Sequence, residues 1–419
     1  MDVPDAIQLM GEKQWEEIKS RLTGKFNKMM KGLFRQKGAQ LDINILASDE
    51  AQEFITTHAD VLDAGFQKVE MSDKMRERLT RSNYIFSGIK TFHELNEAFP
   101  SMLDENGNKK PFERFLNDVQ KINDTYNANY LHAEYNFVQA SATMAAKWEQ
   151  FSEDGDRYYL QYRTAKDDKV RPEHAALDGV TLPMSDSFWE TYYPPNGWNC
   201  RCTVVQVRKQ KYPATEHGEA MSRGEEAMNG ERYNIFRFNS GKQGKTMPDY
   251  NPYTIKRCND CDVAKGKLKL GFVPDYQLCQ GCIMIRKCNE DRNRDNSAKA
   301  TKKSPEVKKL QGTTISNPDF NHEVLITGGS IKEWTNQPHK EYAAKNSILK
   351  HIDKVFREAK YIGFIDNFKK KPGVKQSHLF ETNVLGELSW IIVREYEIGE
   401  FVLHSISDSD KIKTGIRKE

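Results

Sequence analysis

The sequence predicts a multidomain α+β protein: a helical N-terminal region, a small α+β core, a zinc ribbon, and a C-terminal domain of one helix and an antiparallel sheet. Three observations lead to this fold class. A chain of 419 residues is too long for one comfortable core. Apolar residues recur at helical spacing over its first third, whereas a helix followed by several short strands marks its last quarter. Close cysteine pairs lie between these two regions.

The N-terminal region, residues 1–125, is expected to be helical. Helical spacing of apolar residues appears in these segments: 5–34, 49–66, 72–95 and 112–152. Phe86-Ser87-Gly88 is a weak point of the third segment, and the last segment continues into the next domain. The helices predict a bundle that packs its own core. The alternative is that part of their surface docks on a portal or a capsid subunit.

Composition excludes several classes of protein. With 37% hydrophobic and 29% charged residues the chain is polar, and no apolar run approaches the roughly 20 residues of a membrane span, so no membrane partner is expected. The N-terminal residues show no signal peptide. A net charge of +3 does not by itself predict nucleic-acid binding. Seven cysteines in close pairs favour a reducing cytosol and metal sites over a disulfide framework.

The segment from Tyr162 to Val205 contains two strong turn signals. Asp178-Gly179 predicts a tight turn, and residues 194–197 (Pro-Pro-Asn-Gly) predict a second one. These turns would bring together one histidine and two cysteines: His174, Cys200 and Cys202. Imidazole and thiolate are zinc ligands, and the carboxylates considered for the fourth position are Asp168 and Asp178. The alternative is a hydrogen-bonded histidine beside two small core cysteines.

The same segment carries a dense pattern: D-x-x-V-R-x-x-H-x-x-L-D-G, then Phe188-Trp189, then P-P-x-G-W-x-C-R-C. It resembles the phage Mu protein F-like head morphogenesis family, and we assign residues 126–215 to that domain. The resemblance implies a minor head protein of a tailed phage or prophage. Its partners would be the phage portal and capsid proteins, and its location the virion, with assembly in the host cytoplasm.

After a connector at 216–250, residues 251–292 are predicted to form a zinc ribbon. Its ligands would be Cys258, Cys261, Cys279 and Cys282, since two Cys-x-x-Cys pairs seventeen residues apart have four-cysteine spacing. Neighbouring lysines and arginines leave two interpretations open, a structural knuckle or a DNA contact. Residues 293–318 are rich in serine and lysine and predict a charged linker.

Residues 319–419 predict a small α+β domain. Its expected elements are strands at 323–326, 361–365, 377–381, 388–396 and 401–407 and a helix at 341–360. This order, with one histidine near the helix start and another on a strand, resembles the phage-borne nuclease-like domains of the barnase, EndoU and RelE group.

That second resemblance implies metal-independent cleavage of RNA. Four residues are then candidates for catalysis: His339 and His378 as acid and base, Lys340 to steady charge, and Ser407 to contact phosphate. Two functions therefore stay open for the whole chain. It is a head protein with an inactive C-terminal domain, or a head protein that carries a ribonuclease into the host cell.

Overall fold

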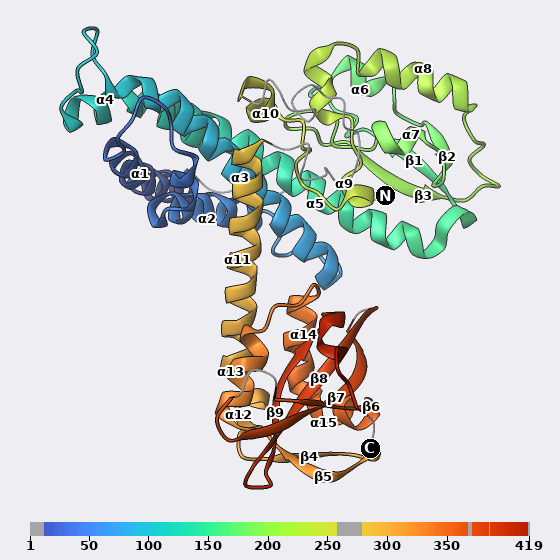
Figure 1. The fold of residues 1–419 in the computed structure, drawn as a ribbon. Helices are drawn as coiled ribbons and strands as arrows, with labels where there is room; N and C mark the ends of the chain where they lie inside the picture. The colour runs from blue at the N-terminus through green and yellow to red at the C-terminus, as the bar shows by residue number, and fades with distance from the viewer. Residues whose placement is uncertain (1–11, 258–278, 368–370, 385, 418–419) are drawn as a thin grey trace. The chain divides into compact units, whose positions relative to one another are not determined.

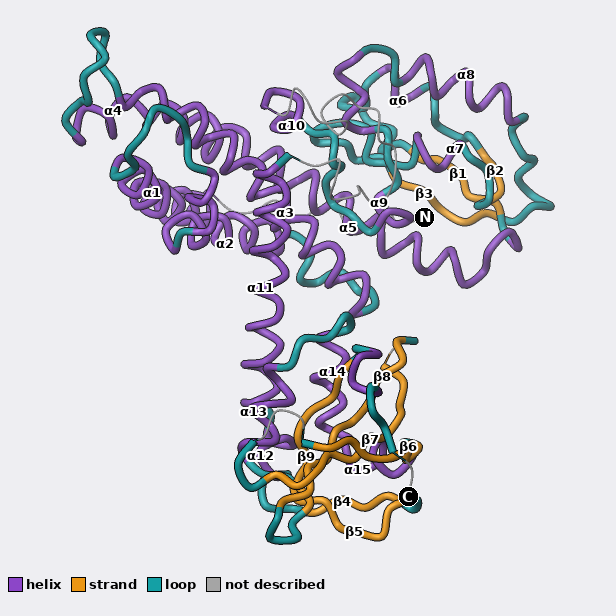
Figure 2. The backbone as a smooth tube through the Cα atoms, viewed as in Figure 1, coloured by secondary structure: helices purple, strands orange, loops and turns teal. Residues whose placement is uncertain are grey.

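The computed structural model of the protein describes residues 12–257, 279–367, 371–384 and 386–417. The chain divides into two units between Asn289 and Glu290. The first unit is mainly helical with one small sheet, and the second contains a larger sheet with short helices (Figure 1, Figure 2). These residues confirm the predicted α+β class, with its helical N-terminal region, small sheet and C-terminal sheet.

Five long helices build the N-terminal part of the first unit: α1 (Glu12–Phe34), α2 (Asp49–Ala64), α3 (Asp73–Ala98), α4 (Phe112–Asn123) and α5 (Leu131–Asp154). Ser48 and Ser72 cap α2 and α3. Each serine Oγ accepts a hydrogen bond from the backbone N–H three residues later, at 3.3 and 3.1 Å. Such a bond satisfies one of the N–H groups that a helix start leaves without a partner.

The helix expected over 72–95 is confirmed, and α3 continues through its predicted weak point, Phe86-Ser87-Gly88, without a break. Gly88 lies against Ile285, and a Cβ at this glycine would be 2.5 Å from Ile285 Cγ2. The glycine therefore permits a close approach of chain segments and does not end the helix. The expected helix over 112–152 is divided by a π-helix, Asp124–Tyr130, between α4 and α5.

The interior of this helical region contains a network of polar side chains. Lys90 Nζ lies 2.7 Å from Glu134 Oε2 and donates to His58 Nε2 and to the carbonyl oxygen of Tyr126, at 3.0 and 2.7 Å. That carbonyl belongs to the π-helix. His58 Nδ1 in turn donates to Ser87 Oγ at 2.8 Å. The π-helix thus supplies an acceptor inside the bundle for a buried ammonium group.

A three-stranded antiparallel sheet follows: β1 (Tyr159–Arg163), β2 (Thr181–Pro183) and β3 (Thr203–Val207), in the order β2-β1-β3. Leu160 of the central strand pairs with Leu182 on one side and Gln206 on the other. The remaining helices of this part of the chain are short: α6 (Pro172–Ala175), α7 (Phe188–Thr191), α8 (His217–Ala227), α9 (Ser240–Gln243) and α10 (Pro252–Arg257).

The zinc ribbon is described only in part. Two of its four predicted ligands, Cys258 and Cys261, lie outside the described residues. Cys279 precedes α11 (Gln280–Lys303), and Cys282 is buried in its first turn. The four-cysteine site therefore stays a prediction.

The charged linker expected at 293–318 has a different structure. α11 runs through its first half, and α12 (Pro305–Lys309) and the start of β4 (Thr314–Asn317) follow. Ala298, Thr301 and Val307 are buried within the second unit. A few small and apolar side chains at helical spacing therefore fold a segment whose composition is that of a linker.

A six-stranded sheet forms the second unit, in the order β4-β5-β9-β8-β7-β6. Its other strands are β5 (Phe320–Leu325), β6 (Lys360–Asp366), β7 (Val374–Val384), β8 (Glu387–Tyr396) and β9 (Phe401–Ser407). Neighbouring strands are antiparallel except β5 and β9, which pair in parallel at Leu325 and Val402. The strands expected at the positions of β6 to β9 are confirmed, whereas β4 was not predicted.

Three short helices accompany this sheet: α13 (Gly328–Asn336), α14 (Tyr342–Ile348) and α15 (Ile352–Glu358). Thr327 and Ser330 form a capping box at the start of α13. The single helix expected over 341–360 is two helices, joined by a 3₁₀ turn at Leu349–His351. α15 buries Ile352 and Phe356, and Ala344 and Ile348 of α14 are partly buried against the same core, which is why the whole segment shows helical spacing.

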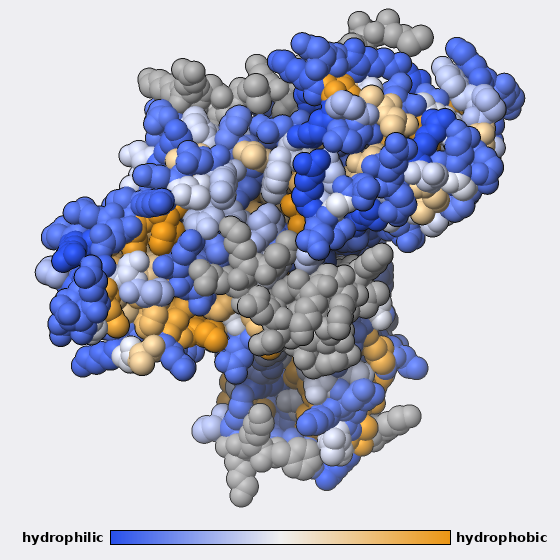
Figure 3. All heavy atoms as spheres, turned by 90° about the horizontal axis from the view of Figure 1, so that it is seen from above, coloured by the Kyte–Doolittle hydropathy of each residue, from blue (hydrophilic) through white to orange (hydrophobic). Residues whose placement is uncertain are grey.

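The surface is mainly polar. On the face shown in Figure 3, hydrophilic residues predominate and hydrophobic residues form small separate patches. Within the described ranges, no helix combines the length and apolar character that a membrane crossing would need.

Candidate metal centre

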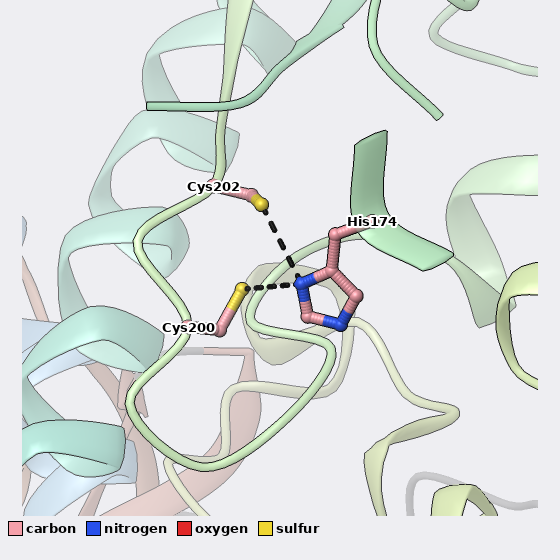
Figure 4. Close-up of side chains that lie close together, drawn as sticks. All are labelled: His174, Cys200 and Cys202. Carbon is pink, nitrogen blue, oxygen red and sulfur yellow. Dashed lines mark hydrogen bonds between the residues drawn. The ribbon is translucent and has the colours of Figure 1, made fainter. Parts of the chain in front are cut away.

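His174, Cys200 and Cys202 converge in the interior of the first unit. The histidine lies on α6, and the cysteines lie on the segment that leads into β3. Each sulfur is 3.7 Å from His174 Nδ1 (Figure 4). The three side chains are buried, and their potential ligand atoms lie within 4.8 Å of one another. This arrangement confirms that the two predicted turns bring these residues together, and the group could hold a metal ion.

The turns that build the group are held by specific contacts. Gly179 has a φ of +84° and donates to the carbonyl oxygen of Tyr162 at 2.9 Å. Arg171 Nη2 donates to the carbonyl oxygen of Trp198 at 2.7 Å. A Cβ at Gly197 would lie 2.9 Å from Arg171 Nη1, so this glycine lets the loop approach the guanidinium. The Asp-Gly and Pro-Pro-Asn-Gly signals therefore have the roles that the sequence predicts.

Neither aspartate that was considered as a fourth ligand belongs to the group. Asp178 Oδ1 accepts hydrogen bonds from Thr164 N and Oγ1, at 2.9 and 3.1 Å, and thereby stabilises the first turn. Asp168 is exposed. Another polar atom close to the sulfurs is the hydroxyl of Tyr162, which donates to Asn196 Oδ1 at 2.8 Å. Burial raises the pKa of Tyr162 well above its usual value, so this hydroxyl is protonated.

The pKa values of the two thiols shift in opposite directions. The hydrogen bond with Cys202 holds the pKa of Cys200 well below its usual value, although burial opposes this, and His174 lowers it further. The same hydrogen bond and burial raise the pKa of Cys202. Cys200 is therefore the thiol that ionises more readily, and a cation bound by both sulfurs would displace the proton of Cys202.

The distances fit a metal that takes both nitrogen and sulfur ligands. Zinc bonds of about 2.3 Å to sulfur and about 2.0 Å to nitrogen, at a tetrahedral angle, place the two ligand atoms roughly 3.5 Å apart. The observed separations are 3.7 Å. His174 Nε2 is buried and has no hydrogen-bond partner among the described residues, so Nδ1 is the nitrogen directed at the sulfurs. Two thiolates and an imidazole suit a borderline-soft cation such as zinc.

The aromatic residues of the sequence pattern pack in the interior of the first unit. Trp189 is fully buried and donates from its ring nitrogen to the carbonyl oxygen of Pro183 at 3.0 Å. Trp198 packs edge-on against Phe137 and Phe236, with ring centroids 5.2 and 5.4 Å apart. The Phe-Trp and Gly-Trp parts of the sequence pattern therefore contribute packing around the histidine and the cysteines.

The predicted catalytic residues of the C-terminal unit fall into two places. His339 Nδ1 accepts from the backbone N–H of Glu341, and Nε2 donates to Ser389 Oγ, both at 3.0 Å. Burial lowers the pKa of His339. Lys340 lies beside it, with Nζ 2.5 Å from Glu387 Oε1. Both ring nitrogens of His339 are thus occupied by internal hydrogen bonds.

His378 has different surroundings. Its Nδ1 lies 2.9 Å from the Tyr361 hydroxyl, and its Nε2 lies 3.1 Å from Glu395 Oε2. His378 pairs with Val393 of β8, whereas His339 contacts Ser389 of the same strand. Four residues of a strand span about 13 Å. The structure therefore does not bring the two histidines together.

Ser407 is on another part of the sheet. Ser407 pairs with Trp390 of β8 and shares its face of the sheet. Because side chains alternate along β8, the neighbouring Ser389 lies on the opposite face. The sequence alone did not indicate that Tyr361 and Glu395 lie beside His378. Their proximity to His378 depends on the register between β6, β7 and β8, which alternation within a single strand does not reveal.

Two family profiles match the chain. The profile described as Phage Mu protein F like protein matches residues 105–205, which include His174, Cys200 and Cys202. The profile described as Large polyvalent protein-associated domain 3 matches residues 293–403, and its description names no nuclease activity. No solved structure matches the chain.

Two phage-related proteins are similar over longer stretches. The "Putative capsid assembly protein F" of Escherichia phage Mu is 31% identical over 329 residues, which cover 72% of this chain and 68% of that protein. The Mu-like prophage FluMu F protein of Haemophilus influenzae is 30% identical over 198 residues, covering 46% of this chain and 42% of that protein. The chain therefore belongs to the phage Mu protein F-like family.

Proposed function

We propose that this protein is a minor head protein of a tailed phage or prophage, which acts in head assembly near the portal and becomes part of the virion. The observation that supports this is the similarity to the capsid assembly protein of phage Mu over most of both chains. Its partners would be the portal and the major capsid protein of the same phage.

We further propose that zinc is the metal held by His174, Cys200 and Cys202, and that its role is structural. The ligand types and the 3.7 Å separations support zinc. Burial of all three side chains supports a structural role, since a catalytic zinc keeps a position open to substrate. The ion would join α6 to the segment before β3, which are linked by two turns and little regular structure.

Co-expression with the portal and major capsid proteins of the same phage tests the head-assembly role. We expect the full chain to co-purify with portal-containing particles, and heads made without it to be fewer or misshapen in electron micrographs. His174→Ala is the variant to compare with the unmodified chain, because it removes one of the three proposed metal ligands and changes no residue of the helical region. Normal heads that neither contain nor require the chain would contradict the proposal.

A second candidate function is RNA cleavage by the C-terminal unit. The favouring observation is His378, which has a carboxylate on one ring nitrogen and a phenol on the other, a suitable arrangement for proton transfer. The full chain would be incubated with bacterial RNA in EDTA. Cleavage that is lost in His378→Ala and retained in His339→Ala supports this function. Intact RNA, or equal cleavage by both variants, argues against it.

A further inference from the structure

A cavity in the first unit has a marked positive charge. Its volume is about 280 Å³, and it lies among α3, the segment after α9 and the first turns of α11. The floor is apolar, with Ile85, Phe86, Ile89 and Met247. The charged residues on its walls are Arg78, Arg81, Lys245, Asp249 and Arg286. Among the described lining residues, four side chains are therefore cationic and one is acidic.

Asp249 is the carboxylate among the described lining residues, and it contacts two of the cationic side chains. Asp249 pairs with Lys245 at 2.5 Å and lies 3.7 Å from Arg286, the latter a long contact. Arg286 Nε is buried and has no hydrogen-bond partner among the described residues. A buried guanidinium N–H without an acceptor is costly. The cavity therefore offers at least one donor that a bound anion would satisfy.

The backbone beside the cavity lies close to the side chain of Arg78. Gly244 adopts a left-handed conformation with a φ of +60°, and a Cβ there would lie 2.3 Å from Arg78 Cζ. Arg78 Nη2 donates to the carbonyl oxygen of Gln243 at 2.7 Å. This bond uses one donor of the guanidinium and fixes its plane, and the other donors make no hydrogen bond to the described residues.

We propose that this cavity binds a phosphate group. Guanidinium groups bind phosphate oxygens through paired hydrogen bonds, and a lysine adds a point charge. The volume lies near the lower limit of small-molecule sites, and it suits one phosphate group together with a small attached group above the apolar floor. A free phosphate compound and a nucleic-acid backbone share this chemistry. The assignment is independent of the proposed role in head assembly.

Isothermal titration calorimetry of the full chain with pyrophosphate and with a short DNA duplex, at constant ionic strength, measures the affinities that test the proposal. Arg78→Gln is the main variant, since Arg78 is exposed and its loss leaves the interior intact. Arg286→Gln removes the buried donor. Arg21→Gln on α1 is the matched control, because it removes the same charge from an exposed position away from the cavity.

We expect pyrophosphate to bind the unmodified chain and Arg21→Gln with equal affinity, and to bind Arg78→Gln and Arg286→Gln at least tenfold more weakly. Binding of DNA alone, with the same losses, would assign the site to a nucleic-acid backbone. No binding of either ligand overturns the proposal. So does an equal loss of affinity in Arg78→Gln and Arg21→Gln, which would indicate attraction to net charge alone.

Discussion

Lys90 and Glu134 form an ion pair in the interior of the helical region, with their side chains 1% and 4% exposed to solvent and their charged atoms 2.7 Å apart. Burial alone would raise the pKa of Glu134, but Lys90 and His58 lower it to about 2, so the carboxylate is charged at neutral pH. The hydroxyl of Tyr253 donates a further hydrogen bond to the same carboxylate. The pair thus joins α3, α5 and α10 through charge.

Removing one member of this pair is expected to destabilise the helical region strongly. Lys90→Met leaves Glu134 buried without its counter-ion, which costs about 3–5 kcal/mol. Hydrogen exchange of peptides from α3 and α5 measures the loss. The control is Arg223→Gln, which breaks an exposed pair with Glu219 and is expected to cost at most about 1 kcal/mol. Similar protection of α3 in both variants would contradict the prediction.

Glu94 is expected to hold a proton at neutral pH. Burial raises its pKa to about 8, despite the opposing charge of Lys90. Neither carboxyl oxygen has a hydrogen-bond partner among the described residues, and the same is true of Oδ1 of the adjacent Asn127. A protonated carboxyl can donate to that amide oxygen. Glu94→Gln keeps such a donor, so it should leave stability at pH 6 nearly unchanged.

The pH dependence of the same residue has a definite sign. A carboxyl whose pKa is higher in the folded chain stabilises it at low pH, and this contribution is lost as pH rises from about 4.5 to about 8. The free energy of unfolding of the unmodified chain should therefore fall over this range relative to that of Glu94→Gln. Parallel curves from denaturant titrations at pH 5, 7 and 9 would show that Glu94 is ionised throughout.

Gly88 and Gly24 give opposite expectations for one substitution. Alanine in a helix interior is normally about 1 kcal/mol more favourable than glycine. Nothing lies within 4 Å of a Cβ at Gly24, so Gly24→Ala should raise the melting temperature. Ile285 occupies the corresponding space at Gly88, so Gly88→Ala should raise the free energy of unfolding little or not at all. Gly88→Leu should lower it by about 1–3 kcal/mol. Stabilisation by Gly88→Ala equal to that by Gly24→Ala would be inconsistent with this packing.

Metal content distinguishes the proposed zinc centre from two inert core cysteines. Cys202→Ser should lower the zinc content of the full chain by one ion, as measured by mass spectrometry, and should lower its melting temperature. Asp168→Asn is the control and should retain all zinc, because Asp168 is outside the group. Zinc affinity should weaken at acid pH, since binding displaces a thiol proton. Equal zinc content in the two variants would indicate that the cysteines are packing residues and not metal ligands.

Much of the fold follows from local patterns in the sequence. The long helices and the four strands from β6 to β9 show their periods directly, because each buries one face against a core. His174, Cys200 and Cys202 were found because two turns with unmistakable residues fix the path of the chain between them.

Other features depend on partners that are distant in the sequence. α11 has a linker-like composition, and its order comes from a few buried contacts. Gly88 reads only as a weak point of its helix until Ile285 is known to lie against it. The hydrogen bonds of His339 to Glu341 and Ser389 occupy both of its ring nitrogens, which its position near a helix start does not reveal. Such cases require tertiary contacts, which a single sequence does not contain.

The parallel pairing of β5 with β9 has a consequence for synthesis of the protein. β9 is the last described strand of the unit, and in the sheet it lies between the β4-β5 hairpin and the other three strands. On the ribosome, the strand pairing that joins the two halves of this sheet cannot form until residues 401–407 have emerged. A message that ends before Phe401 would yield chains in which β5 and β8 both expose unpaired edges, and such edges promote aggregation.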